Sequence, residues 1–368
     1  MWSAIIFVCR FDETQKCDIL QKELDRLQRK GAFPSNAVVL VCADPTPDLG
    51  SGGAMLNALL LVAEHLCAKR GHTVLNPDIF TDEKWLICYM GSDFPPDPRG
   101  MAFLALGDSH VTETGCLLPI NLLLHNYNLV TNKLAAAHNA SGVYVCSCDW
   151  YISLEDDHSD FIADDGPSDI IVYGLPASIT FAQQHGVFKV DAQKGVHDIL
   201  YRGDATQLGQ CSLPDQPEST VPLVCSLMYF SSAVAESLLR LHSVYPLSCC
   251  TYLGVDSGAL GLKLSLYFDF LLPTCRDVSR DAFVQGERAG LYGGSNKTEN
   301  RVNVLNLMPR AREALWSNLS RFKTKCVVLA KTHSPCPTFH YKRIRRQSDI
   351  SYAFSVAPKL PPIPLPRQ

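Results

Sequence analysis

The segment AVVLVCADPTPDLGSGGAMLNALLLVAEHLCAKRG, residues 37–71, decides the fold of this chain. It begins with an uninterrupted apolar run, Ala37–Cys42, which is typical of a strand buried on both faces. A loop rich in proline and aspartate then leads to the glycine cluster Gly50-Ser51-Gly52-Gly53. An apolar helix is predicted from about Ala54 to Arg70, with Gly71 as its stop. A strand, a glycine-rich loop and a helix in this order begin a βαβ unit.

Short apolar runs and helical patterns repeat this arrangement on both sides of the segment. Ala4–Cys9 is a predicted buried strand, and Asp12–Lys30 follows it as an amphipathic helix. The other predicted elements are strands at Trp85–Tyr89, Val143–Cys148 and Ile170–Tyr173, and helices at Ser231–His242 and Arg310–Phe322. Strands that alternate with helices indicate a sheet whose faces are covered by helices. We therefore predict an α/β fold with a mixed, mostly parallel sheet and flanking helices.

The charge of the chain divides it into two parts. The 368 residues carry a net charge of −4, but residues 331–368 contain seven basic residues and one acidic residue, a net charge of +6. The first 330 residues therefore carry −10, and a mildly acidic body argues against nucleic-acid binding. We predict one domain over residues 1–330 and a basic, proline-rich, disordered tail over residues 331–368.

Cysteine usage and the N-terminus predict the compartment. The fifteen cysteines are an odd number and lie within apolar runs, as expected of buried free thiols in a reducing compartment. The N-terminal residues lack the basic region of a signal peptide, and no apolar run reaches the roughly 18 residues of a membrane span. We expect a cytoplasmic protein without a membrane partner.

Three features at predicted strand and helix ends could carry chemistry. The cluster Gly50–Gly53 allows a close backbone approach to an anion at a helix N-terminus, but it fits a tight structural turn almost equally well. Asp149, which follows the strand Val143–Cys148, is placed as an Mg²⁺ ligand would be, or it caps a turn. His185 and Gly186 form a candidate substrate contact or a plain turn into a strand.

Five motifs in order along residues 1–330 resemble the N-terminal half of L-fucose kinases. Leu49–Leu59 is similar to the Gly-Ser-Gly-Gly-Ala-Thr-Leu-Asn-Ala-Leu signature of the animal enzymes, with Met55 in place of the usual threonine. The others are Val145–Asp149, His185–Val187, Cys250–Ala259 and Leu264–Asp269. In that family this half is similar to a GDP-fucose pyrophosphorylase with a nucleotidyltransferase-like, Rossmann-like fold.

The resemblance implies ligands and a set of site residues. The implied ligands are GTP or GDP-L-fucose, fucose 1-phosphate and Mg²⁺. It implies nucleotide binding by Gly50, Ser51, Gly52, Gly53 and Gly91, substrate binding by His185 and Gly186, and metal binding by Asp149 with Asp269 as a weaker second acid. The kinase activity of the family resides in a separate C-terminal half whose Gly/Ser-rich ATP loop is not found in these residues. We therefore expect a short form that does not phosphorylate L-fucose and serves the salvage route to GDP-L-fucose.

The pyrophosphorylase motif departs from the family pattern. Active members carry a loop with an arginine, continuing to Gly-Lys, that supplies positive charge to the triphosphate. Here the stretch Cys88–Pro95 is shortened, Asp93 lies within it, and Met101 stands at the lysine position. Arg99 is the nearest remaining catalytic cation. The alternative is a catalytically inactive module that binds nucleotide sugars or regulates.

The tail has two short motifs of its own. Tyr341–Ser348 resembles a basic-directed phosphorylation site or a weak nuclear signal. Lys359–Arg367 is typical of a polyproline II helix, and Pro361 and Pro364 have the spacing that an SH3 domain reads. The alternative is a solvated tail without a partner.

Overall fold

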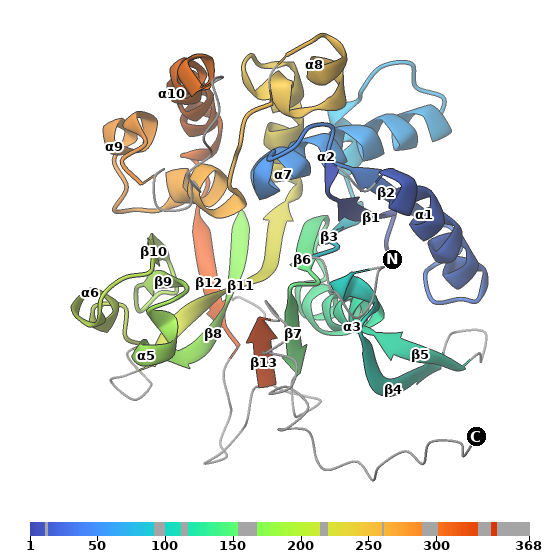
Figure 1. Ribbon diagram of the computed structural model, residues 1–368, viewed down its shortest axis with the longest axis horizontal. Helices are drawn as coiled ribbons and strands as arrows, with labels where there is room; N and C mark the ends of the chain where they lie inside the picture. The colour runs from blue at the N-terminus through green and yellow to red at the C-terminus, as the bar shows by residue number, and fades with distance from the viewer. Residues whose placement is uncertain are drawn as a thin grey trace, which may run out of the picture.

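A nine-stranded mixed sheet forms the centre of the computed structural model (Figure 1). The strand order is β10-β9-β11-β6-β3-β1-β2, with β8 paired to β11 and β12 paired to β8. The structure describes residues 1–11, 14–91, 100–111, 117–153, 168–213, 220–259, 261–288, 301–329 and 340–343.

The first half of the sheet is parallel. Its strands are β1 (Ala4–Cys9), β2 (Val38–Ala43), β3 (Lys84–Tyr89) and β6 (Gly142–Ser147). β1 lies between β2 and β3, and β3 pairs in turn with β6, all in parallel register. The carboxyl ends of these four strands therefore meet at one edge of the sheet, which is where ligands bind in open α/β sheets.

The second half of the sheet is mostly antiparallel. β11 (Thr220–Ser231) runs antiparallel to β6 and to β8 (Ile170–Ser178). The hairpin of β9 (Gly186–Val190) and β10 (Val196–Tyr201) extends the sheet beyond β11, and β12 (Thr324–Val328) pairs in parallel with β8. The predicted mixed sheet with flanking helices is confirmed. β9 begins at Gly186, where the sequence indicated a turn into a strand as one alternative, whereas β10, β11 and β12 were not predicted.

Helices cover both faces of the sheet because successive strand residues point to opposite sides. Along β1, Ala4, Ile6 and Val8 join one buried cluster, while Ile5, Phe7 and Cys9 join another. The first cluster packs against α2 (Gly50–Lys69), α7 (Ser232–Arg240) and α10 (Arg301–Leu319). The second packs against α1 (Thr14–Arg29) and α3 (Leu122–Leu129).

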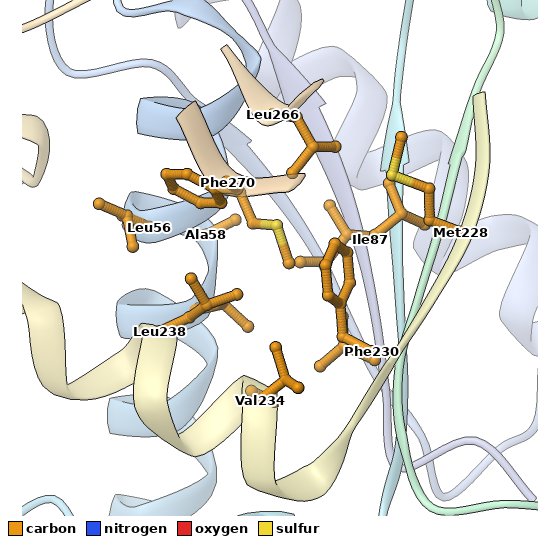
Figure 2. Close-up of a cluster of buried hydrophobic side chains, with 14 of the residues drawn as sticks. Leu56, Ala58, Ile87, Met228, Phe230, Val234, Leu238, Leu266 and Phe270 are labelled. Atoms are coloured by element: carbon orange, nitrogen blue, oxygen red, sulfur yellow. The ribbon is translucent and has the colours of Figure 1, made fainter. Parts of the chain in front are cut away.

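Figure 2 shows how the first face is filled. Phe230 and Ile87 extend from the strands toward Val234 and Leu238 of α7 and toward Ala58 of α2. These side chains are fully buried, and burying each large apolar side chain stabilises the fold by about 1.5–3 kcal/mol. This packed core therefore supports the strands whose carboxyl ends form the edge of the sheet.

The central helix α2 is apolar on nearly all sides because it is enclosed. It begins at Gly50, four residues before the predicted start, so the glycine cluster forms its first turn. By length and composition α2 is the one helix among the described residues that could cross a membrane. In its most apolar 18-residue stretch, 72% is buried inside the protein. One such helix is a weak indication of a membrane, because a buried core helix has the same composition.

Smaller elements complete the domain. Two two-stranded sheets pair β4 (Ala105–Val111) with β5 (Leu117–Asn121) and β7 (Trp150–Ser153) with β13 (His340–Arg343). The remaining α-helices are α4 (Ala135–His138), α5 (Ile179–Ala182), α6 (Ala205–Gly209), α8 (Tyr252–Asp256) and α9 (Arg280–Gln285). The single-turn helices are η2 (Pro77–Phe80), η3 (Met101–Phe103), η4 (Val130–Leu134), η5 (Leu241–Ser243), η6 (Leu247–Cys250), η7 (Leu266–Leu271) and η8 (Leu272–Thr274).

The basic segment predicted as a disordered tail contains one strand. His340–Arg343 form β13, which pairs antiparallel with β7, the strand that begins directly after Asp149. The other residues of 331–368, including Pro361 and Pro364 of the predicted SH3 motif, lie outside the described residues.

A charged cluster stabilises the β9–β10 hairpin. The His197 ring lies between two carboxylates, with Nδ1 2.9 Å from Asp277 Oδ1 and Nε2 3.1 Å from Asp191 Oδ2. Lys189 Nζ donates to Asp277 at 2.8 Å, and Arg276 pairs with Asp191. The hydrogen bond to Asp277, followed by that to Asp191, raises the pKa of His197 against the opposing effect of burial.

We expect this cluster to make stability depend on pH. Because the pKa of folded His197 is above its ordinary value of 6.5, its contribution is complete below pH 6.5 and is lost as pH rises through the folded pKa. The gain is below about 1 kcal/mol because the groups are partly solvated. Urea midpoints of the wild type should fall more steeply above pH 6.5 than those of His197→Gln. Parallel curves for the two proteins would contradict this assignment.

Candidate functional site

Two adjoining cavities lie at the carboxyl edge of the parallel strands. The first, of about 510 Å³, is lined by residues that follow β1 and β2, and we call it the strand-end cavity. The second, of about 350 Å³, is lined by residues of β9, β10 and β11, and we call it the hairpin cavity. Ser51, Tyr89 and Asp149 line both cavities, so the two spaces form one cleft.

The glycine cluster borders the strand-end cavity but is also packed against another segment. Gly50 has φ +74°, and a Cβ atom on it would lie 2.3 Å from the carbonyl oxygen of Leu264. Gly52 N donates to that same oxygen at 2.9 Å. Gly50 and Ser51 line the cavity, whereas Gly52 and Gly53 are buried beneath it. The close approach that the structure shows is to Leu264, which favours the structural alternative for Gly50 and Gly52.

Ser51 is fixed at the junction of the two cavities. Its Oγ accepts the Leu266 backbone N–H at 3.0 Å, and its carbonyl accepts the Tyr89 hydroxyl at 2.5 Å. Burial raises the pKa of Tyr89 well above its ordinary value, so this hydroxyl stays protonated and donates. The junction is therefore held by three separate elements: α2, β3 and the first residue of η7.

Asp149 is placed where the sequence predicted it, close to the carboxyl end of β6 and two residues beyond it. Its backbone N–H donates to Ser147 Oγ at 3.1 Å, and that hydroxyl lies 3.4 Å from Asp149 Oδ2. Gly91 faces it, since a Cβ on Gly91 would lie 3.3 Å from Asp149 Oδ1, and φ at Gly91 is +82°. Asp149 therefore brings a half-buried carboxylate to both cavities.

Asp269, the second predicted metal ligand, lies elsewhere. Its side chain is 0% exposed and lines neither cavity. Oδ2 accepts the Ser265 backbone N–H at 2.7 Å, and Oδ1 accepts from Arg312 Nε at 3.4 Å. The structure therefore does not bring Asp149 and Asp269 to one metal site.

The side chains of the cleft fit Mg²⁺ only in a site that the ligand's phosphates and water complete. Among the described residues, no group of three or more His, Cys, Asp or Glu side chains could hold a metal ion. Mg²⁺ nevertheless binds many enzymes through one or two carboxylates together with substrate phosphates and water. Asp149 fits that mode, in which the ion would neutralise phosphate charge.

His185 and Gly186 meet Asp149 in the hairpin cavity. The His185 ring stacks on Phe181, with centroids 4.8 Å apart, and lies 6.5 Å from the Trp150 ring. Gly186 begins β9, and a Cβ on it would lie 3.2 Å from Val224 Cγ2. The two residues predicted to contact substrate thus share a cavity with the predicted metal ligand.

The sequence reasoning missed two cations that line the strand-end cavity, Arg10 and Lys263. Arg10 directly follows β1, so its place at a strand end was a readable signal. Lys263 arrives only because the segment before η7 packs on the glycine cluster, and no local pattern shows that contact. Both residues are exposed.

The loop that departs from the family pattern is described in part. Arg99, the predicted catalytic cation, and Asp93 lie outside the described residues. Met101 lies in η3 with 2% of its surface exposed, and it packs in the second buried cluster. A charge at this position would be buried in apolar surroundings, so the local structure suits methionine.

Comparison with known proteins gives one family. A family model described as "Fucose pyrophosphorylase domain" matches residues 78–336, more than half of the chain. A crystal structure of HddC from Yersinia pseudotuberculosis complexed with GMP-PN has 11% identity and a TM-score of 0.35, covering 96% of this chain and 99% of its own. A second HddC structure from that organism has 16% identity and a TM-score of 0.27, covering 64% of this chain and 58% of its own. No match was found among curated proteins.

Proposed function

The chain belongs to the fucose pyrophosphorylase domain family, and we propose that it binds GDP-L-fucose, or the pair GTP and fucose 1-phosphate, in the cleft formed by the two cavities. The observation that carries the proposal is the shared lining of the cavities. One carboxylate, Asp149, and one hydroxyl, Ser51, stand between a space bordered by cations and a space bordered by aromatic rings. A nucleotide sugar likewise has two larger groups, a nucleoside and a sugar, joined through a diphosphate.

The strand-end cavity suits the nucleotide. Arg10 and Lys263 line it and could pair with phosphate oxygens, which is the main requirement that phosphoryl chemistry places on a protein. Asp44 and Asp48 line the same space and could accept from a base or ribose. The larger of the two volumes is therefore assigned to the larger group.

The hairpin cavity suits the sugar. Trp150, Tyr201 and Tyr267 provide flat apolar faces, and His185 provides a polar edge. Pockets of this kind, mostly apolar with a few placed polar groups, fix the orientation of a small ligand. Asp149 would hold Mg²⁺ at the boundary, beside the phosphate that joins the two parts.

The finer assignments are part of the same proposal. The five sequence motifs support placing the chain with the N-terminal half of L-fucose kinases and hence in L-fucose salvage. A cytoplasmic location is supported by the thirteen described cysteines, all free thiols and twelve of them buried.

We expect Asp149→Asn to remove the Mg²⁺-dependent part of ligand binding. Losing one charge-assisted contact should weaken GDP-L-fucose binding in Mg²⁺ by about 10- to 100-fold, because such contacts contribute about 1.5–3 kcal/mol. Calorimetric titrations with and without Mg²⁺ measure this. Asp281→Asn, at a side chain 91% exposed on α9, is the matched control. If the wild type binds neither GTP nor GDP-L-fucose at millimolar concentration, the site is wrong.

A second candidate is binding without turnover. The buried Met101 favours it, since the lysine that the resemblance places there is replaced by a core side chain. Pyrophosphate release from GTP and fucose 1-phosphate separates the candidates. Release that requires Asp149 shows an enzyme, whereas GDP-L-fucose binding without release shows a binding module.

A further inference from the structure

The hydroxyl of Ser226 is a buried polar group in the wall of the hairpin cavity. Among the residues that the structure describes, its Oγ has no hydrogen-bond partner. Burying a hydroxyl without a partner is unfavourable, and native proteins contain few such groups. An exception that borders a ligand cavity therefore needs an explanation.

The backbone holds Ser226 at this place by an irregularity in β11. β11 pairs with β6 from Met228 onward and with β9 at Leu223, and its register against β8 shifts between Val224 and Met228. Irregularities of this kind occur next to active sites, where they redirect a side chain. Ser226 lies inside this one.

Neighbouring contacts keep the irregularity rigid. The Tyr267 hydroxyl donates to the Cys225 carbonyl at 2.9 Å, and Cys225 Sγ lies 3.0 Å from the Tyr173 carbonyl. Burial raises the pKa of Tyr267, so its hydroxyl remains a donor. These contacts satisfy polar groups next to Ser226, but none of them involves the Ser226 hydroxyl.

We propose that Ser226 Oγ hydrogen-bonds a hydroxyl group of the glycosyl part of the bound ligand, which makes it a specificity-determining residue of a sugar subsite. The inference rests on the proposed function and deepens it, because it assigns one residue to one part of the ligand. In a ligand pocket, the placed polar groups fix the orientation of the ligand. The bound sugar supplies the partner that Ser226 otherwise lacks.

The test compares two ligands that differ only in the sugar. Ser226→Ala should weaken GDP-L-fucose binding by about 3- to 12-fold, the range of one neutral hydrogen bond. GDP binding should not change, because GDP does not reach the hairpin cavity. The melting temperature of the free protein should stay the same or rise, since the variant removes an unpartnered buried hydroxyl.

Thr46→Val is the matched control. Thr46 Oγ1 is the other buried hydroxyl without a partner among the described residues, and Thr46 lines neither cavity. The control should leave the affinity for both ligands unchanged.

Three results would overturn the inference. Equal GDP-L-fucose affinity in wild type and Ser226→Ala would show that the hydroxyl holds only water. Equal weakening of GDP and GDP-L-fucose would place Ser226 outside a sugar subsite. If the wild type binds neither ligand, the proposed function itself fails. The other two results contradict only the role of Ser226 and leave the proposed function intact.

Discussion

Gly50→Ala is expected to lower the free energy of unfolding by about 2–5 kcal/mol. A left-handed backbone costs a residue with a Cβ about 1–2 kcal/mol, and forced overpacking adds about 1–3 kcal/mol. Both apply here, because Gly50 has φ +74° and its new Cβ would lie 2.3 Å from the Leu264 carbonyl oxygen. A backbone oxygen cannot rotate away as a side chain can, so α2 and the segment before η7 must separate.

Gly71→Ala measures the backbone cost alone, so the difference between the two variants gives the cost of the close contact. Gly71 follows the C-terminal end of α2 with φ +78°, but nothing lies within 4 Å of the position of an added Cβ. This variant should lose only about 1–2 kcal/mol, the cost of the backbone conformation. Urea denaturation followed by circular dichroism measures both. If the two variants lose the same stability, contact with Leu264 is unimportant and the cluster serves the ligand instead.

The local pattern of the sequence predicted the parallel half of the sheet. Ala4–Cys9 and Ala37–Cys42 are continuous apolar runs because both faces of their strands are covered, and such runs stand out from their polar neighbours. Asp149 could be placed at the same edge for the same reason, since it directly follows a third apolar run, Val143–Cys148. Here the predicted positions and the structure agree.

Most of the antiparallel half could not be predicted in this way. Ile170–Tyr173, the start of β8, was predicted as a strand, but β10, β11 and β12 were not. β11 is long, changes partner within its length and contains Pro222, so no single period describes it. The contact of Gly50 with Leu264 joins residues more than 200 positions apart, and the glycines alone are compatible with a ligand or a neighbouring chain segment. Contacts of this range decide which side chains enter the cleft.

The surroundings of Asp269 also depend on a distant residue. An acidic residue inside the apolar run Leu264–Leu272 has the pattern of a functional carboxylate. Its partner, Arg312, lies 43 residues further along the chain, on α10. A buried ion pair and a buried ligand cannot be distinguished until the second charge is located.

Asp269→Asn is expected to lower the free energy of unfolding by about 3–5 kcal/mol, because it leaves the charge of Arg312 buried without compensation. Asp269 is 0% exposed and Arg312 only 6%, so both charges of this ion pair are buried. Chemical denaturation at neutral pH measures the loss. The double variant Asp269→Leu/Arg312→Met should recover most of it, since a buried ion pair can often be exchanged for apolar side chains at little cost.

An exposed pair provides the control for Asp269→Asn. Glu236 and Arg240 pair one turn apart on α7, and Glu236→Gln should change stability by no more than about 0.5 kcal/mol. The metal-ligand role that the resemblance implies gives the opposite pattern for Asp269→Asn. In that case the variant would keep its stability and lose Mg²⁺-dependent binding of GDP-L-fucose, as Asp149→Asn does. Stability and binding measured on the same two variants therefore decide whether Asp269 supports the fold or holds the ion.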